Sequence, residues 1–340
     1  MNRDDTLWYG QYGGCFIADA FSISCDDYYQ AYQTVTDSAD FAEEYAALCR
    51  LFADVKFAFE KAGGDLVLCR TSEIPYPILG TALLTKKLGR KKALCGVRYA
   101  DEAELCARVC AYLGVNLKLF LAKGLSGIPS LLSYLRALGA ECETQSCKEL
   151  FDLPEMYAFQ EWVGSPESAC IINCRSNAGA FPQTNIATDF SKEFGEKLKA
   201  EMEKNRYADV NCIVAPAISG SYALSVFKAF AGSGKLVSVE CDEKDELKEE
   251  LDSYCGTFTK VMRNCFDDRI LAPELANLFD SGAVERKRMS YEEASAAEKE
   301  LLRFGTPASL QSAAAYAYAS KYNEGRTLCL MRAPRCGTVL

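Results

Sequence analysis

The sequence contains no histidine and no Cys-x-x-Cys pair. Histidine is the usual general base of nucleophilic catalysis, so its absence excludes Ser-His-Asp and Cys-His mechanisms. A zinc site would have to use carboxylates or thiolates at other spacings. Cys106 and Cys110 share one face of an expected helix, which is typical of small core residues. We therefore expect no metal site.

Long apolar runs and a secretion signal are also missing, and the basic clusters present, such as KKLGRKK at 86–92, are short and lie at the end of an expected helix. No stretch approaches the ~20 apolar residues of a membrane span, and the opening MNRDDTLWYG lacks the pattern of a signal peptide. A net charge of −9 argues against nucleic acid, because phosphate binding needs clustered lysine and arginine. The 17 cysteines are odd in number and indicate reduced thiols. We expect a cytoplasmic protein that contacts neither nucleic acid nor membrane.

What is present is a regular alternation of strand-like and helix-like segments. Such alternation predicts an α/β protein, and 340 residues are enough for two lobes, each a mostly parallel sheet covered by helices. The acidic run 240–252 is expected to be a solvated surface helix. Strands are expected at 65–69, 93–97, 116–121, 169–174, 212–216, 235–240 and 327–332. Helices are expected at 26–35, 40–52, 79–88, 101–113, 130–138, 186–203, 221–231, 291–304 and 309–322.

One strand-to-helix junction has the features of an anion site. The strand 212–216 leads into Ser219-Gly220-Ser221 and then a helix. Backbone N–H groups at a helix N-terminus hold phosphate well, and ligands of open α/β sheets bind beyond the carboxyl ends of strands. The same residues also fit an ordinary turn with a serine cap. A second junction, at Thr306 and Ser309, is interpreted as the cap of a closely packed helix.

Short segments spread over nearly the whole chain match one known family in order and spacing. They are 9–17 (YGQYGGCFI), 113–115, 135–140 (LRALGA), 213–215, 219–221, 239–240, 272–274, 309–312 (SLQS) and Arg335. Together they resemble the β subunit of tryptophan synthase, a pyridoxal-phosphate enzyme of fold type II. The resemblance implies an N-terminal segment and helices at 1–60 that pack on the C-terminal lobe, an N-terminal lobe at 61–185 with a mobile, α-subunit-contacting region at about 95–175, and a C-terminal lobe at 186–340.

The residues that would carry the family's chemistry are replaced. The resemblance places the Schiff-base lysine in the segment that here reads EIPYPIL at 73–79, without lysine. Lys86 and Lys87 lie further along the following helix. Without an amine the cofactor loses its covalent anchor, and the reaction loses the base that moves the α-proton. The junction therefore resembles an attachment site that has been removed and closed with prolines.

Other matching positions also depart from the family. Its catalytic glutamate falls on Gly96, and its loop for the substrate carboxylate becomes VRYADE at 97–102, whose acidic side chains would repel a carboxylate. We expect no catalytic residue and only vestigial cofactor contacts. Those contacts are Ser219, Gly220, Ser221 and Tyr222 in the phosphate loop, Gln311 near the ring, and Ala333 in place of the serine at the pyridine nitrogen.

These departures predict a pseudoenzyme without bound cofactor, acting as a scaffold or partner subunit. Its partner would be a second copy, an active β subunit or an α subunit of tryptophan synthase. Three alternatives remain open. They are an enzyme with new chemistry around Cys95, Arg98, Asp101 and Glu102; a sensor of an amino acid or indole-like ring; and a pyridoxal-phosphate-dependent lyase of the tryptophan synthase β type with a rearranged site.

Overall fold

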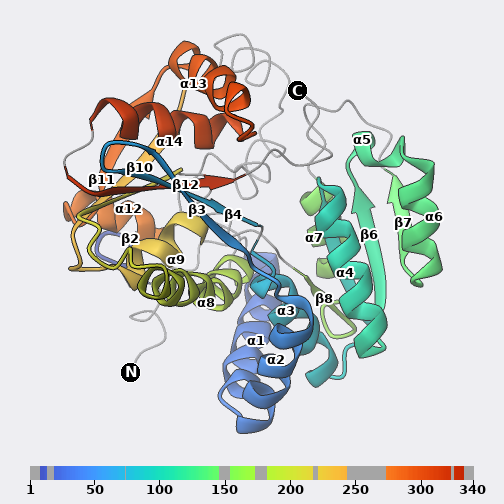
Figure 1. Cartoon of the computed structure of the whole chain (residues 1–340). Helices are drawn as coiled ribbons and strands as arrows, with labels where there is room; N and C mark the ends of the chain where they lie inside the picture. Colours follow the sequence, from blue (N-terminus) through green and yellow to red (C-terminus); the bar gives the residue numbers. More distant parts are fainter. Residues whose placement is uncertain are drawn as a thin grey trace.

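Two β-sheets, each flanked by helices, form the framework of the protein (Figure 1). A small antiparallel hairpin of β1 (Trp8–Tyr9) and β2 (Tyr12–Gly13) precedes them. The hairpin packs on α12 (Pro273–Asp280), where Gln11 and Tyr12 both donate hydrogen bonds to Asp280. The computed structural model describes residues 8–13, 19–72, 74–144, 154–172, 182–216, 221–242, 273–322 and 325–332.

The larger sheet has six strands in the order β11-β10-β9-β12-β4-β3. All neighbours pair in parallel except β3 and β4, which pair antiparallel. Its central strands are continuous apolar runs, as expected where both faces of a parallel sheet are covered. The strands are β3 (Phe57–Gly63), β4 (Leu66–Thr71), β9 (Cys212–Pro216), β10 (Lys235–Cys241), β11 (Glu285–Met289) and β12 (Thr327–Arg332).

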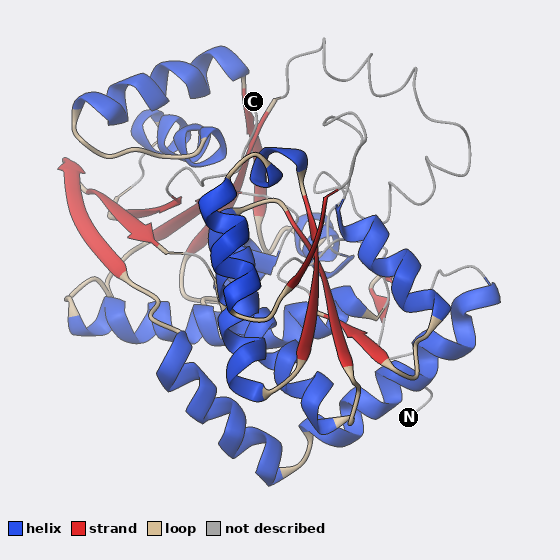
Figure 2. Ribbon diagram, turned by 90° about the vertical axis from the view of Figure 1, so that its right-hand side faces the viewer, coloured by secondary structure: helices blue, strands red, loops and turns tan. Residues whose placement is uncertain are grey.

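The smaller sheet has four parallel strands in the order β7-β6-β5-β8, and Figure 2 shows helices on both of its sides. Successive side chains of β5 point to opposite faces. Cys95 therefore faces α4 (Ala100–Leu113), whereas Gly96 faces α7 (Pro154–Gly164). The strands are β5 (Lys92–Val97), β6 (Asn116–Leu121), β7 (Glu141–Thr144) and β8 (Ala169–Ile171).

Local sequence sets several helix ends. Ser38 accepts a hydrogen bond from the backbone N–H of Phe41, and Ser290 forms a capping box with Glu293. Gly114 ends α4 with a φ of 69°, which glycine adopts at little cost. The remaining helices are α1 (Asp19–Thr36), α2 (Ala39–Phe52), α3 (Tyr76–Lys87), α5 (Lys123–Ser126), α6 (Pro129–Ala137), α8 (Gln183–Lys204), α9 (Ser221–Ala229), α13 (Tyr291–Arg303) and α14 (Leu310–Lys321).

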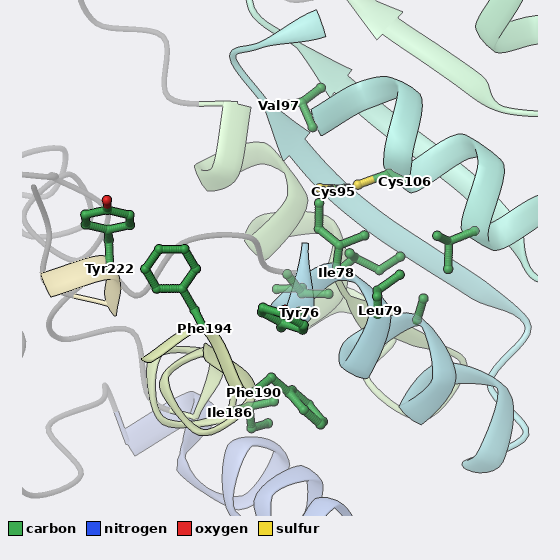
Figure 3. Close-up of a cluster of buried hydrophobic side chains, with 14 of the residues drawn as sticks. Tyr76, Ile78, Leu79, Cys95, Val97, Cys106, Ile186, Phe190, Phe194 and Tyr222 are labelled. Carbon is green, nitrogen blue, oxygen red and sulfur yellow. Dashed lines mark hydrogen bonds between the residues drawn. The ribbon is translucent and has the colours of Figure 1, made fainter. Parts of the chain in front are cut away.

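Helix α3 joins the two halves of the molecule. Its residues 76–85 are all buried, and it packs against α8 on one side and against α4 and the smaller sheet on the other. Gly80 permits the contact with α8, since a Cβ atom there would lie 2.4 Å from the ring of Phe190. One apolar core therefore extends from the larger sheet through α3 to the smaller one (Figure 3). A second core lies on the opposite face of the larger sheet, under α13 and α14.

The expected architecture is confirmed, with corrections in detail. The first predicted helix begins earlier, at Asp19, and the edge strands β3, β7 and β11 and helices α7 and α12 were not predicted. Glu240 and Cys241 end a strand and do not begin a surface helix; residues 243–252 lie outside the described part. The predicted lobe boundary at residue 61 falls inside β3, and β3 and β4 pair with the C-terminal strands. The division into lobes stays a prediction.

No helix in the described ranges is both long and apolar enough to cross a bilayer.

Candidate functional site

The carboxyl ends of β4 and β12 meet the start of α9 at the place where α/β sheets bind ligands. Thr71 and Arg332 are the last residues of their strands and are partners in the parallel register. Tyr222, the second residue of α9, lies against both of them. Of the predicted phosphate-loop residues, Ser219 and Gly220 lie outside the described part, and Ser221 begins α9.

The side chain of Tyr222 is buried and held on three sides. Its hydroxyl oxygen lies 3.0 Å from Oγ1 of Thr71, which is also 3.4 Å from the carbonyl oxygen of Met331. Either hydroxyl can donate in the pair of Tyr222 and Thr71, and Thr71 is also placed to donate to the carbonyl of Met331. The rings of Tyr222 and Phe194 lie side by side (Figure 3), with their centroids 5.0 Å apart. The guanidinium carbon of Arg332 lies 5.0 Å from the centre of the Tyr222 ring. The strand ends are therefore covered by an aromatic side chain.

Burial raises the pKa of Tyr222 well above the ordinary value for tyrosine. The hydrogen bond with Thr71 opposes this shift but does not cancel it. The phenol consequently stays protonated at physiological pH. It does not supply a base.

The junction after β4 leads almost directly into α3. Tyr76, the first residue of that helix, is completely buried, and the ammonium of Lys197 lies 5.0 Å from the centre of its ring. At the far end of α3, Lys87 forms ion pairs with Asp40 and with Glu44. Lys87 is thus held against α2, and Lys197 lies against the first residue of α3.

Gly96 has no room for a side chain. A Cβ atom there would lie 2.2 Å from the backbone nitrogen of Glu155 and 2.3 Å from the carbonyl carbon of Pro154, at the start of α7. Distances this short are not found between real Cβ atoms and backbone. At the position where the resemblance expects a catalytic glutamate, the fold therefore requires glycine.

The segment after β5 is tied to α7 by an ion pair. Nε of Arg98 lies 3.0 Å from Oε1 of Glu155, and Nη2 donates to Oε2 at 3.2 Å. Further along, Oδ1 of Asp101 accepts a hydrogen bond from the backbone N–H of Glu102, at the first turn of α4. These charged groups serve contacts within the protein, and Arg98 does so across a distance of 57 residues in sequence.

Cys95, the predicted alternative nucleophile, is completely buried. Its sulfur lies 3.7 Å from that of Cys106 on α4, and the two side chains face each other in Figure 3. A thiol in such apolar packing is a core residue, because reactive cysteines are partly exposed and lie near positive charge. Cys110 is likewise buried, which confirms the core interpretation of the helix pair.

Gln311 links α14 to β10. Its Oε1 accepts a hydrogen bond of 3.0 Å from the backbone N–H of Cys241, the last residue of β10. Ser309 caps the same helix by accepting a hydrogen bond from the N–H of Ser312, as predicted. Gln311 thus has a structural contact of its own. Ala333, the other predicted ring contact, lies outside the described residues.

A shallow hollow of ≈ 450 Å³ lies at the amino ends of β5 and β6. Lys92 on its wall is neutralised by Glu161 at 2.9 Å and by Glu141 at 3.5 Å. Ligands of parallel sheets bind at the opposite, carboxyl ends. The hollow is therefore no candidate for the principal site.

Sequence reasoning identified Tyr222 but missed its partners. The tyrosine was recognisable because it stands where the family has small residues. Thr71 and Arg332 carried no signal, since each is an ordinary residue at the end of an apolar strand.

Comparison with known proteins agrees with this architecture. No family model matches the chain. It is 25% identical to the tryptophan synthase beta chain of Bacillus subtilis (strain 168) over 93% of this chain and 89% of that protein. It is 21% identical to the tryptophan synthase beta chain of Streptomyces coelicolor over 69% of this chain and 58% of that protein.

The crystal structure of a T.th. threonine deaminase is similar in fold. The TM-score is 0.59 at 17% sequence identity, and the match covers 88% of this chain and 98% of the deaminase chain. The fold is thus that of fold-type II pyridoxal-phosphate enzymes.

Proposed function

We propose that this chain, a divergent relative of the tryptophan synthase β chains, is a pseudoenzyme that acts as a non-catalytic scaffold or partner subunit. It keeps the two-sheet fold and has lost the covalent site for pyridoxal phosphate. Its many buried free cysteines fit a reducing compartment such as the cytoplasm.

The observation that carries the proposal is the closed end of β4 and β12. Enzymes of this type use a lysine amine to hold the cofactor aldehyde, and a phosphate loop beside it. Here the segment 72–79 has no lysine. In α9, the helix that follows the predicted phosphate loop, the side chain of Tyr222 packs onto Thr71 and Arg332. The residues present do not fit a covalently bound pyridoxal phosphate.

Gly96 gives independent support. Restoring the family's glutamate at this position would require α7 to move, because the backbone of Pro154 and Glu155 occupies the space. The start of α7 therefore packs against Gly96 in the space that a glutamate side chain would need. This close packing favours a role that depends on the fold and not on the reaction.

Exposed apolar side chains support a role in assembly. Leu51 and Tyr112 are more than half exposed, and Tyr112 packs edge-on against Phe52, at a ring distance of 5.5 Å. Exposed apolar groups on adjacent helices are common at protein interfaces. We propose a second copy of this chain, or an α or active β subunit of tryptophan synthase, as the partner.

Incubation with pyridoxal phosphate tests the loss of function. After borohydride reduction and peptide mapping, we expect no lysine modified in stoichiometric amount, and no tryptophan formed by the purified chain. The triple variant Lys86→Arg, Lys87→Arg, Lys197→Arg is the control, because labelling that it retains must come from other lysines. Stoichiometric modification of one lysine in the native chain, lost in this variant, would contradict the proposal.

Co-purification from the native cell identifies the partner. A chain that is strictly monomeric and purifies alone would contradict the scaffold role.

A further inference from the structure

Helix α8 begins with a buried glutamine whose amide is unsatisfied. Gln183 is 3% exposed, and neither Oε1 nor Nε2 has a hydrogen-bond partner in the described part of the chain. A buried polar group without a partner costs ~1–3 kcal/mol, so nearly all such groups in native proteins are paired. The amide offers one acceptor and two N–H donors that remain to be used.

The same end of α8 has backbone donors that the helix itself does not use. The first bond within the helix runs from the N–H of Ile186 to the carbonyl of Pro182, so the N–H groups of residues 183–185 have no partner within the helix. Pro182 has no side chain that can cap them, and the first turn contains no acidic residue. The N-terminus of this 22-residue helix therefore keeps its partial positive charge.

The two features point to the same place. Side chains of a helix tilt toward its N-terminus, so the first residue carries its side chain over the end where these N–H groups lie. The Gln183 amide and these backbone donors consequently face a common point. Phe194, which contacts Tyr222, lies eleven residues later, or about 16 Å along the helix. The end of α8 is thus separate from the closed strand ends.

We infer that the N-terminus of α8 binds a small oxyanion that also carries a hydrogen-bond donor. The oxyanion would accept hydrogen bonds from the backbone N–H groups and from Nε2 of Gln183. A hydroxyl or ammonium on the same molecule would donate to Oε1, which a plain carboxylate or sulfate leaves unsatisfied. Phosphate with its P–OH group and a free amino acid share this chemistry. The inference concerns reversible binding and does not depend on the pseudoenzyme proposal.

Paired ligands test the inference on the full chain. Thermal unfolding and calorimetric titration compare phosphate with sulfate, and glycine with acetate, at equal ionic strength. Sulfate and acetate resemble their counterparts but lack the donor. A ligand that binds only the folded state raises the melting temperature. We expect phosphate, glycine or both to raise it and to bind at least tenfold more tightly than the matched control; which of them does so identifies the class of natural ligand.

Substitution of Gln183 separates binding from folding. Gln183→Leu removes the amide at similar size and should fold at least as well as the native chain, because a buried unpaired group is lost. We expect binding to weaken at least tenfold, and Gln30→Leu on the exposed face of α1 to leave it unchanged. Equal responses to all four ligands, or unaltered binding in Gln183→Leu, would overturn the inference and leave bridging water as the partner. Neither outcome affects the borohydride test.

Discussion

The hydroxyl oxygens of Tyr222 and Thr71 lie 3.0 Å apart in the interior, where α9 meets the carboxyl end of β4. The two residues are 151 positions apart in sequence, so their contact depends on the assembled sheet. The contact covers the carboxyl end of β4, the side on which parallel sheets bind ligands.

Removal of the Tyr222 hydroxyl should weaken the fold without disrupting it. We expect Tyr222→Phe to lower the free energy of unfolding by ~1 kcal/mol, the usual net value of a buried hydrogen bond. Thr71→Val should cost a similar amount, and the double variant less than the sum, because the two side chains share one bond. Urea denaturation measures each value, with Tyr134→Phe on the surface as control. Strict additivity would show that the two hydroxyls do not interact.

A methyl group at Gly96 should be poorly tolerated. We expect Gly96→Ala to destabilise the protein by ~3 kcal/mol, at the upper end of overpacking effects, because the added carbon meets backbone and not a movable side chain. Gly164, the last residue of α7, has open space around its Cβ position and is the matched control. Gly164→Ala should change stability by less than ~0.5 kcal/mol. Comparable melting temperatures for the two variants would contradict the packing described at Gly96.

Acid should weaken the contact between α7 and the smaller sheet. Burial alone would raise the pKa of Glu161, but hydrogen bonds and charge interactions with Lys118 and Lys92 outweigh it and lower the pKa below the ordinary value. A lowered carboxyl pKa stabilises the fold above the unfolded-state value, ~4.3, and this contribution is lost as pH falls through the folded-state value. We expect Glu161→Gln to cost ~1 kcal/mol at pH 7 and progressively less below pH ~4.

Chemical denaturation at several pH values measures this difference. Glu104→Gln, in an exposed pair with Arg108, is the control and should show little dependence on pH. A Glu161→Gln effect that stays constant down to a pH of about 3 would show that the charge of Glu161 contributes nothing.

Cys95 should resist alkylation in the folded protein. Both Cys95 and Cys106 are completely buried, and access to them requires local unfolding. With iodoacetamide at neutral pH, we expect mass spectrometry to detect modification of Cys95 only after denaturant is added. Cys142, which is partly exposed, serves as the internal comparison, although burial raises its pKa as well. Rapid labelling of Cys95 in the native state would revive the alternative of new thiol chemistry.

The class of fold follows from local signals in the sequence. The apolar runs of β4, β9 and β12, and the glycine and serine residues that bound the helices, are local signals that the assembled structure follows. Edge strands were missed for a physical reason. β11 reads ERKRM and is held by pairing with β10 and by charge pairs such as Arg286 with Glu240, not by an apolar pattern.

The side chains that fill the site are placed there by packing between distant parts of the chain. The lack of a lysine at 73–79 and the tyrosine at 222 were visible in the sequence. The partners of Tyr222, the backbone that excludes a side chain at Gly96, and the unpaired amide of Gln183 were not. Each depends on atoms that distant segments bring within a few ångströms, and no local pattern encodes such distances, because they arise only when sheets and helices pack together.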